Sequence, residues 1–485
     1  MVHPPAMVEV STRRARAGAV LAPLAFAVVW LLPTPLEPIQ QRLAAIAAAV
    51  IVAWVTEVLP IPVTALLIAP AMVAAGITDA KTAFYPYADP LLFLFYGSFF
   101  IAAAMGRHGL DRRIAHAIVS HPIIEGTPWR TRAAMMAAGG LLSMWISNTA
   151  STAILMPILL GTFGVVGDDP RQRKALTGGL LAIAYACSIG GVGTLVGTPP
   201  NMITVRLLKE TGVNLSFVQW SMIGIPASAT IVLVIYALFF RLYPPGDQGP
   251  VEVPAEEREA PGPLSRGERV TALCFLVAIT GWVVPGVLKA AGLELAGPVS
   301  KALPAGGVAM LASGLLFLFK DEDGRTPVLP WPEARKVDWG LIMLFGGGIS
   351  LGTQMFDTGL ARELGRGFIA LTGVSDVWTL TAVAVLFTIF FTEVCSNTAT
   401  SNMVIPLVIG ITTELGVSPV APSIGVGLAA SCAFMMPIAT GPNAIVYGTG
   451  HVQLPAMMRA GVILNLVCAA IVFALVRTLV PLYGW

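Results

Sequence analysis

The sequence predicts an all-α polytopic membrane protein built from inverted repeats, with two re-entrant hairpins and two broken helices. Three observations predict this fold: recurrent apolar runs, motifs that recur in the same order in both halves, and glycine and proline breaks inside apolar segments. Of the 485 residues, 56% are hydrophobic and only 12% are charged, whereas a soluble globular chain has about 25% charged residues. The composition therefore indicates a chain that resides in a bilayer.

The apolar runs are long enough to cross a bilayer as helices. A helix rises about 1.5 Å per residue, so about 20 apolar residues span about 30 Å of hydrocarbon. Backbone groups find no water there, which favours helices over open strands. We expect spans at 18–36, 41–58, 60–79, 90–108, 218–243, 268–290, 301–319, 338–360 and 457–482, hairpins at 130–165 and 376–412, and broken helices at 174–212 and 421–449.

Positive charge orients the chain. With the N-terminus in the cytoplasm, about two thirds of the 29 Lys and Arg residues fall in cytoplasmic segments, as the positive-inside rule requires. Arg13, Arg14 and Arg16 precede the first apolar run, and Pro33 follows it instead of a small-residue cleavage site, so we expect an uncleaved first span. The Pro- and Glu-rich loop 244–268 is then cytoplasmic and the C-terminus periplasmic. A net charge of +2 indicates no nucleic-acid partner.

The two halves of the chain carry matching motifs at a nearly constant offset. An odd number of crossings separates the two copies in the expected threading, so the second copy is inverted. Inverted repeats with broken helices are typical of secondary transporters, whose binding site lies at the repeat interface. The matched pairs are Gly97 with Gly347, Gly109-Leu110 with Gly359-Leu360, Ser147-Asn148-Thr149-Ala150 with Ser396-Asn397-Thr398-Ala399, Pro157 with Pro406, and Thr198-Pro199-Pro200-Asn201 with Thr440-Gly441-Pro442-Asn443.

The paired Ser-Asn-Thr motifs place small polar side chains inside apolar segments. Such residues favour helix N-caps, and a helix that begins inside the membrane directs free N–H groups and a partial positive charge at its surroundings. An anion is the natural occupant, while Ser and Asn oxygens with freed carbonyls could hold a hard cation such as sodium. One copy would be equally well explained by a polar contact between helices. Two copies at matched positions favour a binding site.

The second motif pair breaks its helices with Gly and Pro, and we expect its Thr and Asn residues to supply oxygens at the break. Irregular backbone at membrane depth either lines a cavity or is buried in protein. Neither the Ser-Asn-Thr motifs nor the breaks contain Lys or Arg. A dianion bound there would need helix N-termini and co-bound cations to offset its charge. Sodium coupling follows from that need.

Other chemistry-bearing residues give weaker signals. Glu393 is an ionisable residue at membrane depth, either functional or paired with a neighbouring helix. The five cysteines lie in apolar stretches without metal-ligand spacing, so we interpret them as packing residues. An intramembrane enzyme would need a catalytic pair or a metal cluster in the spans. The His and Cys positions offer neither, so we do not expect an enzyme.

At the paired motifs the chain resembles the divalent anion/sodium symporter family, which includes bacterial dicarboxylate transporters and the animal sodium/dicarboxylate and sodium/citrate cotransporters. The resemblance covers roughly residues 18–482 and depends on both Ser-Asn-Thr motifs and both Thr-x-Pro-Asn breaks. It implies a homodimer in a bacterial inner membrane, with a scaffold and an elevator-type transport domain whose hairpins carry the Ser-Asn-Thr motifs at their tips. It implies sodium-coupled symport of C4 dicarboxylates such as succinate, malate or fumarate, without an organic cofactor. A sodium-independent exchanger, or a carrier of a tricarboxylate or sulfate, stays open.

The resemblance also assigns residues to the site. One sodium ion would use Ser143, Ser147, Asn148 and backbone near Gly197, and a second would use Thr392, the backbone of Cys395, Asn397 and backbone near Ala439. The substrate carboxylates would meet Asn148, Thr149, Thr198, Asn397, Thr398 and Thr440, with Pro199 and Gly441 nearby. Gly441 stands where the first repeat has Pro199, a difference that we expect to affect substrate size.

The implied division of the chain alternates scaffold and transport regions. A cytoplasmic tail, the first scaffold helices and the first-repeat transport region would occupy 1–17, 18–89 and 90–212. Further scaffold helices, the second-repeat transport region and the last helix would occupy 213–337, 338–456 and 457–485.

Overall fold

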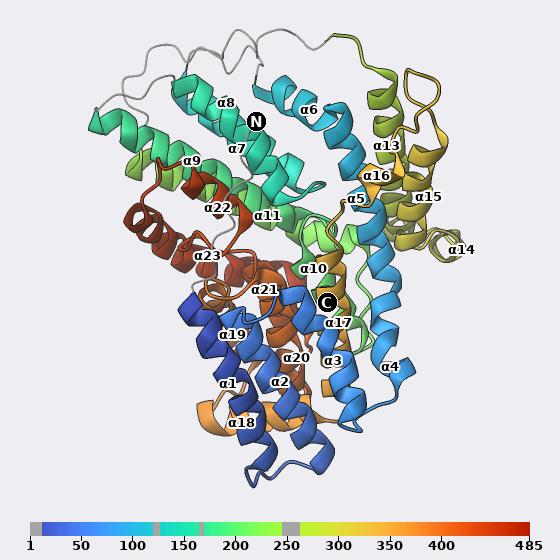
Figure 1. Ribbon diagram of the computed structural model, residues 1–485, viewed down its shortest axis with the longest axis vertical. Coiled ribbons are helices and arrows are strands. Elements are labelled where there is room, and N and C mark those ends of the chain that lie inside the picture. Colours follow the sequence, from blue (N-terminus) through green and yellow to red (C-terminus); the bar gives the residue numbers. More distant parts are fainter. Residues whose placement is uncertain (1–11, 120–126, 164–168, 245–261) are drawn as a thin grey trace.

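The structure, a computed structural model, describes residues 12–485 except 120–126, 164–168 and 245–261 (Figure 1). Over these residues the chain is helical, and its β-structure is limited to an isolated bridge between Lys320 and Pro327. Eight of the described helices are long and apolar enough to cross a membrane, or up to ten spans if two bent helix pairs are included. The predicted all-α polytopic fold is confirmed. The predicted loop 244–268 and tail 1–17 lie largely outside the described residues.

The helices overlap the expected spans, with bounds that differ by up to several residues, and the expected span 301–319 is part of a bent helix pair. In chain order they are α1 (Thr12–Leu31), α2 (Pro38–Thr56), α3 (Ile61–Ala74), α4 (Ala80–Phe84), η1 (Tyr85–Ala88), α5 (Pro90–His108), α6 (Leu110–Val119), α7 (Pro128–Ser143), α8 (Asn148–Phe163), α9 (Pro170–Gly190), η2 (Gly191–Gly193), α10 (Pro199–Lys209), α11 (Phe217–Leu242), α13 (Arg266–Ala290), α14 (Ala296–Ala302), α15 (Ala305–Leu318), α16 (Trp331–Ala334), α17 (Trp339–Asp357), α18 (Leu360–Thr372), α19 (Val377–Phe391), α20 (Asn397–Leu415), α21 (Val420–Ala429), α22 (Gly441–Gly448) and α23 (Leu454–Leu482).

The same order of elements occurs twice. Helix α5 is followed by the short α6, the hairpin α7–α8, the broken helix α9–α10 and α11. Helix α17 is followed in the same way by α18, the hairpin α19–α20, the broken helix α21–α22 and α23. Both series begin at an aspartate N-cap: Asp89 accepts from Leu91 N–H at 2.9 Å and Asp338 from Leu341 N–H at 3.2 Å. The structural repeat therefore matches the motif repeat.

Each repeat packs against a helix from the other half of the chain. A Cβ atom on Gly97 of α5 would lie 2.4 Å from the carbonyl carbon of Ala309 in α15, and one on Gly347 of α17 would lie 2.3 Å from the carbonyl oxygen of Ala65 in α3. Small residues let helix backbones approach this closely. The matched glycines therefore mark two of the close contacts between the halves.

Two short amphipathic helices, α6 and α18, are elements that hydropathy alone does not predict. They follow Gly109 and Gly359, whose φ angles of 75° and 76° lie in the left-handed region, where glycine is favoured. Arg113 of α6 pairs with Glu268 of α13 at 2.5 Å. The repeated Gly-Leu pair thus marks the point at which a span ends and the chain turns into an amphipathic helix.

The predicted packing role of the cysteines agrees with the structure. All five cysteines are buried and free. The expected span 60–79 is shorter than predicted, because α3 ends at Ala74 and Gly76, with a φ of 67°, turns the chain before α4.

Candidate functional site

A cavity of 820 Å³ gathers both hairpin tips and both helix breaks. All eight residues predicted to contact substrate line it: Asn148, Thr149, Thr198, Pro199, Asn397, Thr398, Thr440 and Gly441. Of the predicted sodium ligands, Ser147, Asn148, Gly197, Asn397 and Ala439 line it too, whereas Ser143, Thr392 and Cys395 are buried and do not line it. Their roles as ligands stay predictions.

The cavity also reaches the polar segment between α15 and α17. Glu333, Lys336 and Asp338 line that side, together with Asp111 of α6. Lys336 pairs with Glu333 at 2.8 Å, and burial raises the pKa of the Asp111 carboxyl above its usual range. Among the described residues that line the cavity, Lys336 is the one basic side chain. The motif side of the cavity thus carries no fixed cation.

The tip of the first hairpin contains two buried oxygens without partners. Ser143 ends α7 and Asn148 begins α8, and the Asn148 amide nitrogen donates to the Ser188 carbonyl at 3.3 Å. Within the described part of the chain, Ser143 Oγ and Asn148 Oδ1 are buried and have no hydrogen-bond partner. Because buried polar atoms are normally partnered, this pair indicates a place for a ligand.

Glycines let the first break approach these oxygens. A Cβ atom on Gly191 would lie 2.6 Å from Asn148 Oδ1 and 2.9 Å from the Gly197 carbonyl oxygen. The side-chain oxygen and the carbonyl therefore converge on the space that Gly191 leaves open. Oxygens of this kind suit a hard cation. Asn148 and Gly197 are two of the predicted first sodium ligands, and that role stays a prediction.

The asparagine of each break motif holds the unwound backbone. Asn201 donates from its amide nitrogen to the carbonyls of Gly191 at 2.9 Å and Thr194 at 2.6 Å. Asn443 donates in the same way to Ala433 at 3.1 Å and Met436 at 3.0 Å. Their amide nitrogens are engaged because an unwound segment leaves carbonyls that need donors. Their Oδ1 atoms are buried without partners among the described residues, so the expected supply of oxygens at the breaks stays a prediction.

At the tip of the second hairpin, the residues equivalent to Ser143 and Asn148 are bonded to each other, although Thr400 Oγ1 in the first turn of α20 is buried without a partner among the described residues. The Thr392 hydroxyl lies 2.7 Å from Asn397 Oδ1 and 2.9 Å from the Ala430 carbonyl, within reach of either as a donor. Ser396 caps α20 by accepting from Ala399 N–H at 3.2 Å, as Ser147 does for Ala150 at 3.2 Å. The predicted N-cap role of both serines agrees with the structure.

Glu393 joins the second hairpin tip to the second break. Its carboxylate accepts from the backbone N–H groups of Phe434, Met435 and Met436 at 2.7, 2.9 and 3.0 Å, and from the Asn465 amide of α23 at 2.8 Å. Of the two interpretations of Glu393, contact with a neighbouring helix is present. The contact with three successive backbone donors has no signature in the sequence, because any residue can supply an N–H group.

The first hairpin touches the start of α22. A Cβ atom on Gly441 would lie 2.1 Å from the Thr149 hydroxyl oxygen. Pro199 and Pro200 begin α10 and lack N–H donors, whereas Gly441 gives α22 a donor at its first position. The exchange of Pro199 for Gly441 therefore gives the two helix N-termini that line the cavity different shapes and different numbers of N–H donors.

Comparison with known proteins identifies relatives over nearly the whole chain. Residues 14–485 match the model of the sodium:sulfate symporter transmembrane region. An uncharacterised transporter of Haemophilus influenzae is 31% identical over 398 residues, covering 82% of each chain. The sodium-dependent dicarboxylate transporter SdcS of Staphylococcus saprophyticus is 32% identical over 413 residues, covering 81% of this chain and 77% of the relative. SdcS of Staphylococcus aureus (strain USA300) is also 32% identical.

Two solved structures share the fold at low sequence identity. The YdaH transporter of Alcanivorax borkumensis superimposes with a TM-score of 0.57 at 14% identity, over 85% of this chain and 89% of that one. MtrF of Neisseria gonorrhoeae superimposes with a TM-score of 0.59 at 14% identity, over 96% of this chain and 94% of that one. These likenesses concern the arrangement of helices alone.

Proposed function

The chain belongs to the sodium:sulfate symporter family, and we propose that it carries C4 dicarboxylates across a bacterial inner membrane by sodium-coupled symport. The observation that supports this most directly is the buried, unpartnered Asn148 Oδ1 beside the Gly197 carbonyl, with a second buried and unpartnered oxygen, Ser143 Oγ, at the end of α7 in the same hairpin tip. Leaving two such oxygens unpartnered costs free energy. A sodium ion at this place would remove that cost.

The substrate class follows from charge and from helix ends. Four helices, α8, α10, α20 and α22, begin at residues that line the cavity. Each N-terminus carries a partial positive charge and favours an anion. Since the motif side has no Lys or Arg, two bound sodium ions and these helix ends would balance a dicarboxylate. The staphylococcal relatives are named as sodium-dependent dicarboxylate transporters, which supports the same class.

The second sodium ion would bind at the second tip, with Thr392, Asn397 and the backbone of Cys395 and Ala439 as ligands. There the Thr392 hydroxyl is already bonded, so this ion would exchange a protein hydrogen bond for its own contacts. The substrate carboxylates would bind between the sites, at Asn148, Thr149, Thr198, Asn397, Thr398 and Thr440.

Alternating access would be of the elevator type, in a homodimer. The hairpins and broken helices of 90–212 and 338–456 would move against the scaffold of 18–89 and 213–337. The cavity reaches the segment 320–337. Its four basic residues, Lys320, Arg325, Arg335 and Lys336, favour a cytoplasmic position by the positive-inside rule. The conformation described would then be the inward-open one, with the N-terminus cytoplasmic.

The proposal is tested with purified protein reconstituted in proteoliposomes. We expect uptake of radiolabelled succinate to require an inward sodium gradient and to be inhibited by malate and fumarate more than by citrate or sulfate. Succinate–succinate exchange without sodium would contradict symport and favour an exchanger. Stronger inhibition by citrate or sulfate than by malate and fumarate would show that the substrate is a tricarboxylate or sulfate.

A further inference from the structure

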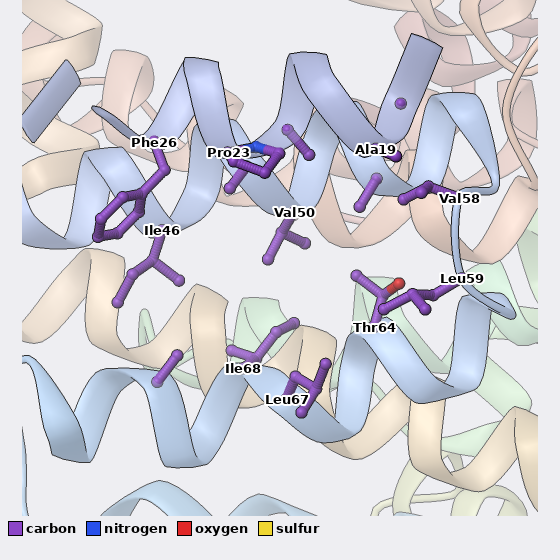
Figure 2. Close-up of a pocket in the computed structure, with 15 residues that line it drawn as sticks. Ala19, Pro23, Phe26, Ile46, Val50, Val58, Leu59, Thr64, Leu67 and Ile68 are labelled. Atoms are coloured by element: carbon purple, nitrogen blue, oxygen red, sulfur yellow. The ribbon is translucent and has the colours of Figure 1, made fainter. Parts of the chain in front are cut away.

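A second cavity, of 580 Å³, lies between α1, α2 and α3, outside the proposed transport site (Figure 2). Its walls are apolar side chains such as Phe26, Ile46, Val50 and Ile68, and Thr64 is the one polar side chain among its lining residues. Helix α1 is the most exposed candidate span, with 11% of its apolar window buried inside the protein. The cavity therefore lies beneath a helix that faces the bilayer.

Thr64 gives this apolar cavity a single polar position. The residue is 4% exposed and its hydroxyl oxygen is buried without a hydrogen-bond partner among the described residues. In Figure 2 it lies at the same end of the cavity as Ala19, Val58 and Leu59. A buried hydroxyl in apolar surroundings needs an acceptor. Its position at one end of an apolar cavity points to a ligand with one polar group and a long apolar part.

That end of the cavity carries Arg13 and Arg16 of α1 and one carboxylate, Glu57, which directly precedes the lining residue Val58, so its net charge is positive. Arg13 and Arg16 are exposed on the first turns of α1, and Arg16 lies about 4.5 Å along the helix axis from Ala19 at 1.5 Å per residue. No hydrogen-bond or ion-pair partner for these two side chains occurs among the described residues. At the opposite end, Arg42 is engaged: it donates to the Ala75 carbonyl at 3.1 Å and lies over the Trp30 ring at 5.9 Å.

We propose that this cavity binds one anionic glycerophospholipid. Its phosphate lies at Arg13 and Arg16, an ester carbonyl accepts a hydrogen bond from the Thr64 hydroxyl, and its acyl chain runs along the cavity toward Phe26 and Ile46. Basic side chains at a membrane surface attract anionic headgroups, and burial of an acyl chain in an apolar cavity is favourable. The three features occur in the order phosphate, ester and acyl chain that a glycerophospholipid carries.

The bound lipid would lie beside a contact that crosses the molecule. Arg14 donates to the Val55 carbonyl at the end of α2 and, at 2.8 Å, to the Val394 carbonyl in the second hairpin tip. Both contacts depend on α1 holding its place on α2, where Gly18 packs against Thr56. A lipid between α1 and α3 stabilises that placement, so we expect the anionic lipid to raise the melting temperature of the protein.

The test uses full-length protein in detergent, with native mass spectrometry and thermal shift as readouts. The probes are dioleoyl phosphatidylglycerol and dioleoyl phosphatidylcholine, which have identical acyl chains, and glycerol phosphate as the free headgroup. We expect phosphatidylglycerol to bind roughly tenfold or more tightly than phosphatidylcholine and to raise the melting temperature. Glycerol phosphate alone should leave the melting temperature unchanged.

Three sets of variants separate the parts of the proposal. The double variant R13Q/R16Q should abolish the preference for phosphatidylglycerol, and the control R325Q/R335Q, at two exposed arginines elsewhere, should retain it. Thr64→Val should lower the binding affinity for both lipids by roughly fivefold, the effect of losing one hydrogen bond. Ala49→Leu, or Ala71→Leu if the first fails to fold, should fill the cavity and abolish retention of either lipid.

Four outcomes would overturn the proposal. They are equal binding of the two lipids to the unmodified protein, a preference that survives R13Q/R16Q, lipid retention unchanged in the folded cavity-filling variant, and a stabilising effect of glycerol phosphate alone. Dissociation of an oligomer by Ala49→Leu would also overturn it, because the cavity would then be an interface between copies of the chain.

Discussion

The two hairpin tips carry the same Ser-Asn-Thr motif but satisfy their oxygens in different ways. At the first tip, Ser143 Oγ and Asn148 Oδ1 are buried without partners among the described residues. At the second, the Thr392 hydroxyl lies 2.7 Å from Asn397 Oδ1. The second tip also has Glu393 bound to three backbone N–H groups of the break, where the first repeat has Met144.

The difference assigns distinct tasks to the repeats. At the first tip, Ser143 Oγ and Asn148 Oδ1 are not bonded to each other, so a cation would bind there without breaking a hydrogen bond between them. The second tip has its oxygens joined, so a cation must replace a hydrogen bond, while the Glu393 carboxylate keeps the break in place. We therefore expect the first proposed sodium site to fill at a lower sodium concentration than the second.

The largest expected effect is the loss of protein stability on substitution of Glu393. Glu393→Gln keeps the shape but places an amide among four donors, and disruption of such a buried charged network costs about 3–5 kcal/mol. We expect a large fall in melting temperature, measured by thermal shift in detergent. The matched control is Met144→Leu at the equivalent first-repeat position, which should cost less than about 1.5 kcal/mol. Equal losses in the two variants would contradict the proposed role of Glu393.

The second prediction concerns sodium affinity at both tips. Asn148→Ala and Asn397→Ala each remove a proposed ligand, and loss of one contact to a charged group costs about 1.5–3 kcal/mol, or roughly ten- to a hundredfold in affinity. Sodium activation of succinate uptake should shift to higher concentrations in both variants, with folding less affected. Unchanged sodium dependence in both purified variants would refute the assignment of these ligands.

The third prediction concerns the contact between repeats at Gly441. A methyl group there would meet the Thr149 hydroxyl oxygen at 2.1 Å, and overpacking of this kind costs about 1–3 kcal/mol. Gly441→Ala should raise the KM for succinate. The control is Gly448→Ala in the same helix, where an added Cβ meets nothing within 4 Å. A KM that rises equally in both variants would show that helix α22 as a whole, and not this contact, is responsible.

The smallest expected effect is on the stability of the sodium-free protein when the buried hydroxyl of either hairpin tip, Thr392 or Ser143, is removed. Thr392→Val removes a bonded hydroxyl and should destabilise the sodium-free protein by about 0.5–1.5 kcal/mol. Ser143→Ala removes an unpartnered hydroxyl and should leave the stability of the sodium-free protein unchanged or raised. Thermal shift without sodium measures both. A larger loss for Ser143→Ala would mean that its oxygen has a partner in the sodium-free state.

The sequence predicts the parts of this fold that depend on residue type and periodicity. The repeat can be recognised in the sequence because Gly97 and Gly347 permit close helix contacts that larger residues would block. The broken helices likewise need Gly and Pro at matching positions. Helices α6 and α18 were not predicted, since their amphipathic pattern lies between spans. The backbone partners of Glu393 and the amide contacts of Asn201 and Asn443 depend on where unwound segments meet in space, which no local pattern encodes.

Coupling between sodium and substrate is the central claim, and calorimetry of succinate binding to the purified protein tests it most directly. Because the motif side of the cavity lacks fixed cations, succinate affinity should fall steeply as sodium is removed, and sodium affinity should rise with succinate by the same factor, since coupling is reciprocal. Tight succinate binding in the complete absence of sodium would contradict the account and favour a sodium-independent exchanger.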